Sequence, residues 1–301
     1  MTIDKFVELI KQRPYIKRQG RGFLSKRYKM SPDDVVKAKN LANIGKYIPK
    51  ILIFDIETAP IKAYIWKLWK TDVHLEQIIN DWFCIAWSAK WLYDECTMGD
   101  VLTPEEIKNE DDKRIMTSLW ELINEADIVV SHNGNKFDIP RINSRFIING
   151  LSPTKPYFSV DTCQIARRQF GFSSNKLDAL ATHFNIPHKL ETSFDLWKRC
   201  LEGDREALQY MLTYNMKDVT ILEEVYLKLR PWIKNHPNMG NLEGSANACA
   251  NCGSEDISWI PDKFYYTSVG KYPLFRCNKC DAVSRGRKKV NESPGTTSIS
   301  R

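Results

Sequence analysis

The sequence predicts an α/β fold, with a small helical segment before the main sheet and a small cysteine-rich module after it. From residue 51 to about residue 230, apolar runs of strand length alternate with helical patterns, which is typical of a sheet covered by helices. Two C-x-x-C pairs near the C-terminus predict a separate module. The 301 residues, 43% hydrophobic and 27% charged, suffice for two domains and exclude wholesale disorder.

Charge is distributed unevenly along the chain. Residues 1–50 contain 13 Lys and Arg against 4 Asp and Glu, residues 51–229 contain 20 against 27, and residues 230–301 contain 11 against 6. The basic ends indicate a polyanionic partner, and the acidic centre indicates clustered carboxylates that hold cations. A solvated charged surface is the alternative explanation. Because no apolar run approaches the ~18–20 residues that span a bilayer, and no apolar signal core begins the chain, we expect a cytoplasmic protein without a membrane partner.

The first segment, residues 1–48, is predicted to be helical and basic. Ser31 is placed to cap a helix whose first residue is Pro32, because Ser accepts hydrogen bonds from free N–H groups and Pro tolerates that position. A basic stretch over residues 17–22 precedes it. We predict helices over residues 3–12, 23–29 and 32–42 in a helix-turn-helix-like arrangement. A small helical pack that binds no nucleic acid is the alternative.

The central domain is assigned residues 49–236. Apolar runs rich in β-branched and aromatic residues predict strands over residues 51–57, two within 81–101, then 127–131 and 158–161. Helical periodicity predicts helices over residues 104–126, 137–149, 161–170, 175–185 and 204–230. Gly150 is expected to end the second of these helices. Residues 236–248, rich in Asn, Pro and Gly, are predicted to be a linker.

Four acids and one tyrosine stand out within this domain. Asp55 and Glu57 lie two apart on the first strand, so their side chains project from the same face. Burying two like charges together is costly unless a cation neutralises them, and Mg²⁺ prefers oxygen ligands. Asp138 begins a helix, and Tyr214 and Asp218 lie four apart on one face of the last helix. Residues on a strand, a helix start and a late helix can converge on one point.

In this order and spacing, the motifs resemble those of the ribonuclease H-like 3′–5′ exonucleases of the DnaQ superfamily, the group that contains polymerase proofreading domains. The resemblance covers about residues 49–232. It is carried by Phe54-Asp55-Ile56-Glu57-Thr58, by His132-Asn133-Gly134-Asn135-Lys136-Phe137-Asp138, and by Tyr214-Asn215-Met216-Lys217-Asp218, the variant with tyrosine rather than histidine. Two further segments, Val160-Asp161-Thr162 and Lys176-Leu177-Asp178, resemble the stand-alone branch that is frequent in phage and prophage genomes. A phage-encoded protein of this kind would work in the host cytoplasm.

The resemblance implies a mixed sheet flanked by helices and two Mg²⁺ or Mn²⁺ ions. Asp55 would bind both ions, Glu57 and Asp218 would complete the first site, and Asp138 would hold the second. Tyr214 would position the attacking water. The implied activity is metal-dependent 3′–5′ exonuclease action that releases nucleoside 5′-monophosphates, on DNA in preference to RNA, with a polymerase or a replication or repair complex as partner. The alternatives are a structure-specific nuclease or ribonuclease on the same fold, and a non-catalytic nucleic-acid-binding protein.

Several residues near the motifs are secondary candidates. Thr58 at the end of the first motif, and Asn133 and Lys136 in the second, are candidates for contact with the terminal nucleotide or a phosphate. A loop that satisfies its own backbone is the alternative for the last two. Asp161 is a supporting acid outside the core set. The histidines at a helix end, His183 and His188, are expected to be surface or capping residues.

Tryptophans are concentrated after the first motif, at Trp66, Trp69, Trp82, Trp87 and Trp91. Because tryptophans on strands are mostly buried, we predict that they belong to the core. The alternative is that they stack on unpaired bases, as in proteins that bind single strands.

The eight cysteines fall into two groups. The first four, Cys84, Cys96, Cys163 and Cys200, lie in apolar or helical patterns and are predicted to be buried thiols. The last four form two C-x-x-C pairs, predicted to hold one structural Zn²⁺ as a zinc ribbon over residues 245–290: Cys249, Cys252, Cys277 and Cys280. The alternative, two redox pairs, lacks a thioredoxin-like context. Short strands are predicted over residues 257–260, 264–266 and 272–276. A basic rim follows at Arg285, Arg287, Lys288 and Lys289, before a disordered tail over residues 291–301.

Overall fold

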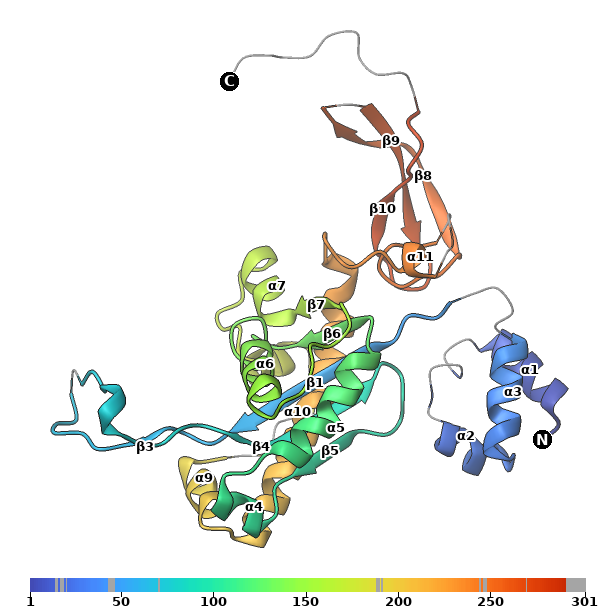
Figure 1. Ribbon diagram of the computed structural model, residues 1–301. Coiled ribbons are helices and arrows are strands. Elements are labelled where there is room, and N and C mark those ends of the chain that lie inside the picture. Colours follow the sequence, from blue (N-terminus) through green and yellow to red (C-terminus); the bar gives the residue numbers. More distant parts are fainter. Residues whose placement is uncertain are drawn as a thin grey trace. The chain divides into compact units, whose positions relative to one another are not determined.

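The structure is a computed structural model that describes residues 1–290, apart from residues 14, 15, 17, 18, 20, 43–46, 70, 188, 189, 191, 244, 246, 247 and 269 (Figure 1). The predicted tail over 291–301, His188 and part of the basic stretch 17–22 lie outside the described residues. The chain forms two compact units, one of Met1–Ala42 with Lys50–Tyr226 and one of Asn43–Pro49 with Leu227–Arg301. Each unit is described by itself.

The N-terminal segment consists of three helices, α1 (Ile3–Gln12), α2 (Arg21–Tyr28) and α3 (Pro32–Ala42). They enclose a small core of their own, which includes Phe6, Ile10, Leu24 and Val35. Ser31 caps α3, because its Oγ accepts a 3.0 Å hydrogen bond from the Asp34 N–H. The three predicted helices are confirmed, and binding of nucleic acid by this segment stays a prediction.

A five-stranded mixed sheet forms the centre of the first unit, in the order β5-β4-β1-β6-β7 (Figure 1). The strands are β1 (Ile51–Thr58), β4 (Cys84–Trp91), β5 (Met98–Val101), β6 (Ile128–Ser131) and β7 (Phe158–Asp161). The central strand β1 runs antiparallel to β4 and parallel to β6. Leu52, Ile53 and Phe54 on β1 are fully buried, so side chains on both faces of the sheet are covered. The predicted α/β class is confirmed.

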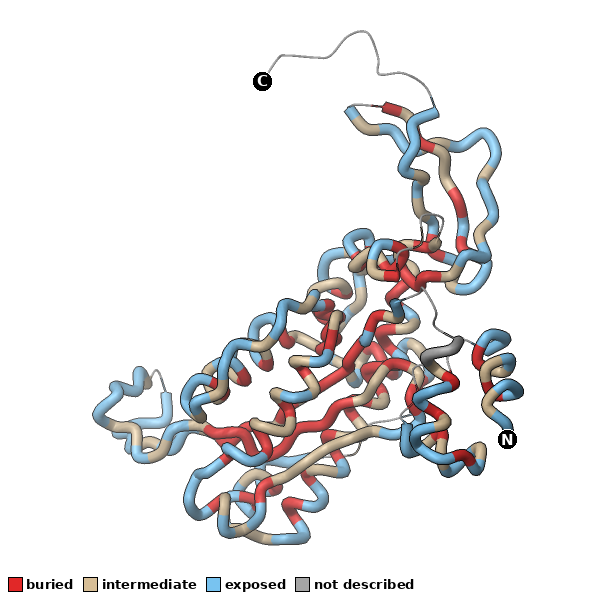
Figure 2. The backbone as a smooth tube through the Cα atoms, turned by 45° about the vertical axis from the view of Figure 1, so that its right-hand side comes forward, coloured by how far each residue is buried: buried red, intermediate tan, exposed pale blue. Residues whose placement is uncertain are grey.

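Helices cover this sheet, and Figure 2 shows the buried strands between exposed helical surfaces. The helices are α4 (Pro104–Asn109), α5 (Lys113–Glu125), α6 (Asp138–Ile148), α7 (Thr162–Gln169), α8 (Leu177–His183), α9 (Phe194–Leu201) and α10 (Arg205–Leu229), followed by the 3₁₀ turn η3 (Arg230–Trp232). Gly150 has a φ of 75° two residues after α6, and ends this helix as predicted. Among the described residues, no helix has the length and apolar character needed to cross a membrane.

One prediction about the helices is wrong, and one helix was missed. The single helix predicted over residues 104–126 is two helices, because Glu110 adopts a left-handed conformation with φ 54°. The buried Asp112 follows this break, where its carboxylate accepts the Cys84 N–H of β4 at 2.9 Å. Helix α9 was not predicted, although its buried residues Leu196 and Cys200 lie four apart, a spacing that indicates a helix.

Helix α10 packs closely against the face of the sheet that carries the site residues. Gly99 on β5 makes this approach possible, because a Cβ at that position would lie 2.8 Å from Leu212 Cδ1 of α10. Glu223 of α10 forms a largely buried ion pair with Lys90 of β4 and accepts the Tyr93 N–H at 2.8 Å. These contacts fix the position of α10 relative to β4, and therefore relative to β1.

A hairpin of β2 (Lys62–Ala63), the 3₁₀ turn η2 (Leu75–Gln77) and β3 (Ile78–Asn80) extends from the end of β1, at the left in Figure 1. Trp66 and Trp69 in this hairpin are 96% and 83% exposed, so the prediction that they are core residues is wrong. A two-stranded hairpin has no second layer to cover its side chains. Trp87 is buried, as predicted, and Trp82 and Trp91 are partly buried.

The scattered cysteines follow the prediction in three of four positions. Cys84, Cys163 and Cys200 are buried, whereas Cys96 is exposed. Cys96 lies in the turn between β4 and β5, outside the strand in which its apolar neighbours placed it.

The second unit contains a three-stranded antiparallel sheet in the order β10-β9-β8. Its elements are α11 (Met239–Leu242), β8 (Ile257–Thr267), β9 (Gly270–Cys277) and β10 (Val283–Arg285). The two strands predicted over 257–260 and 264–266 form one strand, whose pairing with β9 shifts register between Ile260 and Phe264. The predicted linker over 236–248 contains α11, where the Asn238 side chain caps the helix by accepting the Asn241 N–H.

Candidate active site

Three of the predicted acids meet beside the centre of the sheet. Asp55 and Glu57 project from one face of β1, and Asp218 comes from α10. One carboxylate oxygen from each of the three lies within 4.8 Å of the other two. Three ionised carboxylates this close repel one another, whereas a hard divalent cation binds oxygen ligands in such an arrangement. The donor set therefore fits a Mg²⁺ or Mn²⁺ ion.

Asp138, the fourth predicted acid, adjoins this cluster without belonging to its 4.8 Å group. It is the first residue of α6, and its Oδ1 accepts a 3.3 Å hydrogen bond from the N–H of Ile56, the residue between Asp55 and Glu57. Burial raises the pKa of Asp138 to about 7, and the nearby carboxylate of Asp161 adds to the rise. A cation beside Asp138 would favour its ionised form.

Helix α10 also brings an asparagine and the predicted tyrosine to the acids. Asn215 is fully buried and donates from Nδ2 to Asp55 Oδ2 at 2.7 Å, which fixes the orientation of that carboxylate. The Asn215 Oδ1 is buried and makes no hydrogen bond within the described residues. Tyr214 is 5% exposed and packs in the main core, one helical turn before Asp218. Asn215 was not predicted as a site residue, although it lies inside the third motif.

A buried carboxylate anchors α6, the helix that carries Asp138. Arg145 of α6 donates from Nε and Nη2 to Asp112 at 2.6 and 2.8 Å, and Asn149 donates to the same group at 2.8 Å. Because Asp112 also accepts the Cys84 N–H, it joins α6 to β4. Removing one partner of such a buried pair leaves an uncompensated charge and typically costs about 3–5 kcal/mol.

The loop before Asp138 is held by a second buried acid. Asp161 accepts the N–H groups of Asn133 and Asn135 at 3.0 and 3.2 Å, and it caps α7. His132 lies between Thr162 Oγ1 and the Asn175 carbonyl, at 2.8 and 2.9 Å.

Gly134 is required in this loop, because a Cβ there would lie 2.0 Å from Ser131 Oγ. Asp161 supports the same loop through the two N–H groups that it accepts. It was predicted to be a supporting acid outside the core set.

The secondary candidates lie in different surroundings. Asn133 has a φ of 68°, in the left-handed region that Asn tolerates, and the Asn133 carbonyl accepts the Lys136 N–H at 3.1 Å. The Lys136 side chain is exposed. His183 is exposed at the end of α8 and stacks on Phe172 with ring centroids 5.6 Å apart. The backbone contacts of Asn133 and Lys136 are those of a loop that satisfies its own polar groups. Contact of these two residues with substrate stays a prediction.

A cavity of about 450 Å³ adjoins the end of β1. Its residues are Thr58, Ala59, Pro60, Ile61, Trp82, Arg141, Thr192, Ser193, Phe194 and Trp197. The Arg141 guanidinium lies 4.2 Å from the Phe137 ring centroid and 4.5 Å from that of Trp82, and it donates to Thr58 Oγ1 at 3.1 Å. Burial lowers the pKa of Arg141. A positive group is therefore held in place in an aromatic pocket next to the acids.

Comparison with known proteins relates this domain to a family. Residues 97–230 match the model of the RNase_H superfamily. This part of the chain, somewhat less than half of it, is thus similar to RNase H superfamily domains. The match includes Asp138, Tyr214 and Asp218, and it begins after Asp55 and Glu57. The RNase H-like fold implied by the sequence resemblance is confirmed.

Two proteins are similar to longer parts of the chain. A DNA polymerase III PolC-type of Ureaplasma parvum serovar 3 is 28% identical over 189 residues, which cover 60% of this chain and 13% of that protein. The chain therefore spans only about an eighth of the length of this relative. The family B DNA polymerase of the archaeon Pyrobaculum calidifontis superposes with a TM-score of 0.45 at 14% identity, covering 62% of this chain and 26% of that one.

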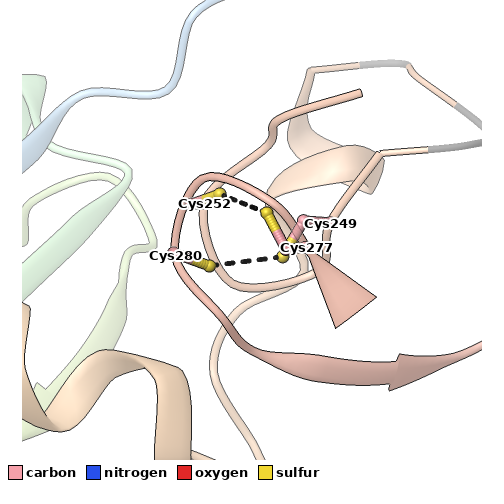
Figure 3. A group of neighbouring side chains, drawn as sticks. All are labelled: Cys249, Cys252, Cys277 and Cys280. Atoms are coloured by element: carbon pink, nitrogen blue, oxygen red, sulfur yellow. Dashed lines mark hydrogen bonds between the residues drawn. The ribbon is translucent and has the colours of Figure 1, made fainter. Parts of the chain in front are cut away.

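Outside the RNase H-like domain, the four C-terminal cysteines form a second cluster (Figure 3). The Sγ atoms of Cys249 and Cys280 are 3.7 Å apart, those of Cys252 and Cys277 are 3.6 Å apart, and all four lie within 4.8 Å of one another. Zn–S bonds of ~2.3 Å in a tetrahedron place sulfurs about 3.8 Å apart, whereas a disulfide needs ~2.05 Å. The cluster therefore fits a zinc ribbon, as predicted.

The two cysteine turns have the same local structure. Gly253 and Asp281 each lie four residues after the first cysteine of a pair, with φ of 75° and 61°, and each donates its N–H to that cysteine's carbonyl. Hydrogen bonding to Cys252 and Cys280 lowers the pKa of Cys249 to about 3, and hydrogen bonding to Cys249 raises that of Cys280. Zn²⁺ binds cysteines as thiolates, so metal binding at this cluster would displace the protons that its sulfurs share.

Proposed function

We propose that the protein is a metal-dependent 3′–5′ exonuclease that hydrolyses nucleic-acid phosphodiesters, on DNA in preference to RNA, and releases nucleoside 5′-monophosphates. The observation that carries the proposal is the acid cluster: Asp55, Glu57 and Asp218 within 4.8 Å of one another, with Asp138 hydrogen-bonded to the backbone between the first two. The RNase H superfamily match, which includes Asp138 and Asp218, supports a nuclease, and the PolC-type DNA polymerase relative supports action on DNA.

The residues have separate roles in the proposed reaction. Asp55, Glu57 and Asp218 would hold one Mg²⁺ or Mn²⁺, and Asp55 and Asp138 a second. When bound, such a pair of ions lowers the pKa of water and stabilises the entering and leaving oxygens of an in-line displacement. Asn215 keeps Asp55 oriented through its 2.7 Å hydrogen bond. Because a phenol is a weak base at neutral pH, Tyr214 would orient the attacking water and not deprotonate it.

The pocket beside the acids suits the terminal nucleotide. Trp82, Phe194 and Trp197 provide aromatic surface for a base, and the guanidinium of Arg141 provides a charged donor for a phosphate or a sugar hydroxyl. Thr58, a predicted substrate residue, lines this pocket and is oriented by Arg141. We therefore add Arg141 to Thr58, Asn133 and Lys136 as proposed substrate-binding residues.

The second metal class and the partners belong to the same proposal. One structural Zn²⁺ would bind Cys249, Cys252, Cys277 and Cys280, because thiolates prefer this softer ion while carboxylates prefer Mg²⁺ or Mn²⁺. The partner is nucleic acid, and a polymerase or a replication or repair complex is the proposed protein partner, which the PolC-type relative supports.

Single substitutions test the proposal. Asp55→Ala, Glu57→Ala, Asp138→Ala and Asp218→Ala should each nearly abolish hydrolysis of an end-labelled oligonucleotide and leave the melting temperature unchanged or higher, because each removes a like charge from a crowded site. Glu121→Ala, on the exposed side of α5, is the matched control and should retain full activity. A folded acid variant with wild-type turnover would remove that residue from the site. Full binding without any hydrolysis by the wild-type protein would favour the non-catalytic alternative.

A further inference from the structure

The hairpin after β1 exposes an unusual amount of aromatic surface. We define residues 61–80 as the aromatic arm. Trp66, Trp69 and Tyr64 are 96%, 83% and 74% exposed, and none of them belongs to the main core cluster. Large contiguous apolar patches are rare on soluble proteins and usually mark an interaction site. The arm is therefore a candidate binding surface.

The base of the arm is ordered although its aromatic side chains are not packed. Lys62 pairs with Asn80, and Ala63 with Ile78, in the short β2–β3 ladder. Tyr64 and Gln77 are joined by two 2.9 Å hydrogen bonds, from the Tyr64 N–H to the Gln77 carbonyl and from Gln77 Nε2 to the Tyr64 carbonyl. The backbone at Tyr64 is thus held by hydrogen bonds, so the exposure of the Tyr64 ring is built into the hairpin, and Trp66 and Trp69 follow within five residues.

The first half of the arm is basic, although Asp72 and Glu76 follow in the second half. The ten residues 61–70 contain Lys62, Lys67 and Lys70 and no acid, whereas residues 51–229 as a whole have an excess of seven acids. Tyr64, Trp66 and Trp69 alternate with these lysines along the chain. Aromatic side chains interleaved with positive charge match a polynucleotide strand, whose bases stack and whose phosphates are negative.

The position of the arm connects it with the acid cluster. The chain leaves β1 at Thr58 and passes through Pro60 and Ile61, which line the pocket, before it enters the arm. It returns from β3 to Trp82, which lines the same pocket. The two ends of the arm therefore both lie at the pocket beside the acids.

We propose that the aromatic arm binds the unpaired strand of the nucleic acid next to the proposed cut. Trp66, Trp69 and Tyr64 stack on bases, and Lys62 and Lys67 contact phosphates. The inference rests on the proposed function for the location of the cut, but strand binding by the arm does not require catalysis. A protein partner and a lipid surface are the competing occupants, and with either of them the affinity for a free single strand would not depend on Trp66 and Trp69.

The decisive comparison replaces the rings while keeping the surface apolar. In the full chain, the W66L/W69L variant loses the aromatic rings and keeps an apolar surface. The W66F/W69F variant keeps both the aromatic rings and the apolar surface. Binding of a fluorescein-labelled single-stranded octanucleotide is measured by anisotropy without added Mg²⁺, so that hydrolysis does not interfere. We expect W66L/W69L to raise the Kd by about tenfold or more, since stacking on two bases is lost, and W66F/W69F to change it by less than about threefold. Unchanged melting temperatures show that the folds are intact.

Two results would overturn the inference. Equal affinities of W66L/W69L and wild type would show that the rings do not contact the strand. Binding of the protein to anionic vesicles that L68A/L75A abolishes, with octanucleotide binding unaffected by W66L/W69L, would assign the arm to a lipid surface. The proposed function fails separately: if no nucleic acid is hydrolysed with Mg²⁺ but binding still depends on Trp66 and Trp69, the arm proposal stands and the exonuclease proposal falls.

Discussion

Replacing Asp138 with asparagine should make the protein more stable at pH 8 in the absence of divalent metal. Burial raises the pKa of Asp138 from 3.8 to about 7. The folded protein therefore holds this proton more tightly than the unfolded chain does. Proton binding at Asp138 therefore adds to the free energy of unfolding below pH 4. This contribution is lost as the pH rises to about 7 and is absent above.

The size of the effect follows from the shift. A rise of about three pKa units corresponds to roughly 4 kcal/mol at about 1.4 kcal/mol per unit. An asparagine side chain has the shape of the protonated acid and keeps an oxygen for the Ile56 N–H. We therefore expect Asp138→Asn to raise the free energy of unfolding by about 3–4 kcal/mol at pH 8 and by close to zero at pH 4.

Urea unfolding at pH 4, 6 and 8 without added divalent metal measures this difference, with Glu121→Gln at an exposed position of α5 as the control. The stability difference between wild type and Asp138→Asn should grow across this range, while the control follows the wild type. Added Mg²⁺ should stabilise the wild type more at pH 8 than at pH 6, because cation and proton compete for the same carboxylate. Equal pH dependence in wild type and Asp138→Asn, or a variant less stable at pH 8, would refute the argument from burial.

Three further predictions concern other parts of the molecule. Tyr214→Phe should reduce turnover less than Asp55→Ala does, because ring packing survives and only the hydroxyl contact is lost; equal losses would indicate a more direct chemical role. Elemental analysis of desalted protein, purified with reduced thiols and without chelator, should find about one zinc per chain, and its absence would exclude the ribbon site. Replacing Arg285, Arg287, Lys288 and Lys289 with Gln should lower the slope of log affinity for long single strands against log salt by up to about 3 units. Backbone hydrogen bonds from Gly286 and Val290 hold this segment beside β9. An unchanged slope would show that its four basic residues bind no phosphates.

The elements that sequence reasoning predicted well are those in which the local pattern of apolar residues matches their burial in the fold. Strand β1 is apolar on both faces in the sequence and buried on both faces in the fold, so its bounds and the shared face of Asp55 and Glu57 follow from periodicity. The cysteine pairs are similar, because each C-x-x-C forms its turn locally, with Gly253 and Asp281 at the left-handed position.

The parts that were missed depend on contacts between distant segments. Arg141 gains its position from Phe137 one turn away and from Trp82 on another element, and the spacing of residues gives no indication of the second contact. The break at Glu110 depends on the burial of Asp112 against β4 and α6. The exposure of Trp66 and Trp69 follows from a hairpin that leaves the sheet, whereas their residue type is typical of a core.

The most direct test of the central claim is the product ladder of the purified protein with Mg²⁺ and single-stranded DNA labelled at the 5′ end, alongside duplex DNA and RNA. The proposal predicts that the labelled strand shortens from its 3′ end one nucleotide at a time, with nucleoside 5′-monophosphates released and DNA cut faster than RNA. The same reaction with Asp218→Ala should leave the strand intact. Internal fragments from the first time point, shortening from the 5′ end, or equal cleavage by Asp218→Ala would contradict a 3′–5′ exonuclease at this acid cluster.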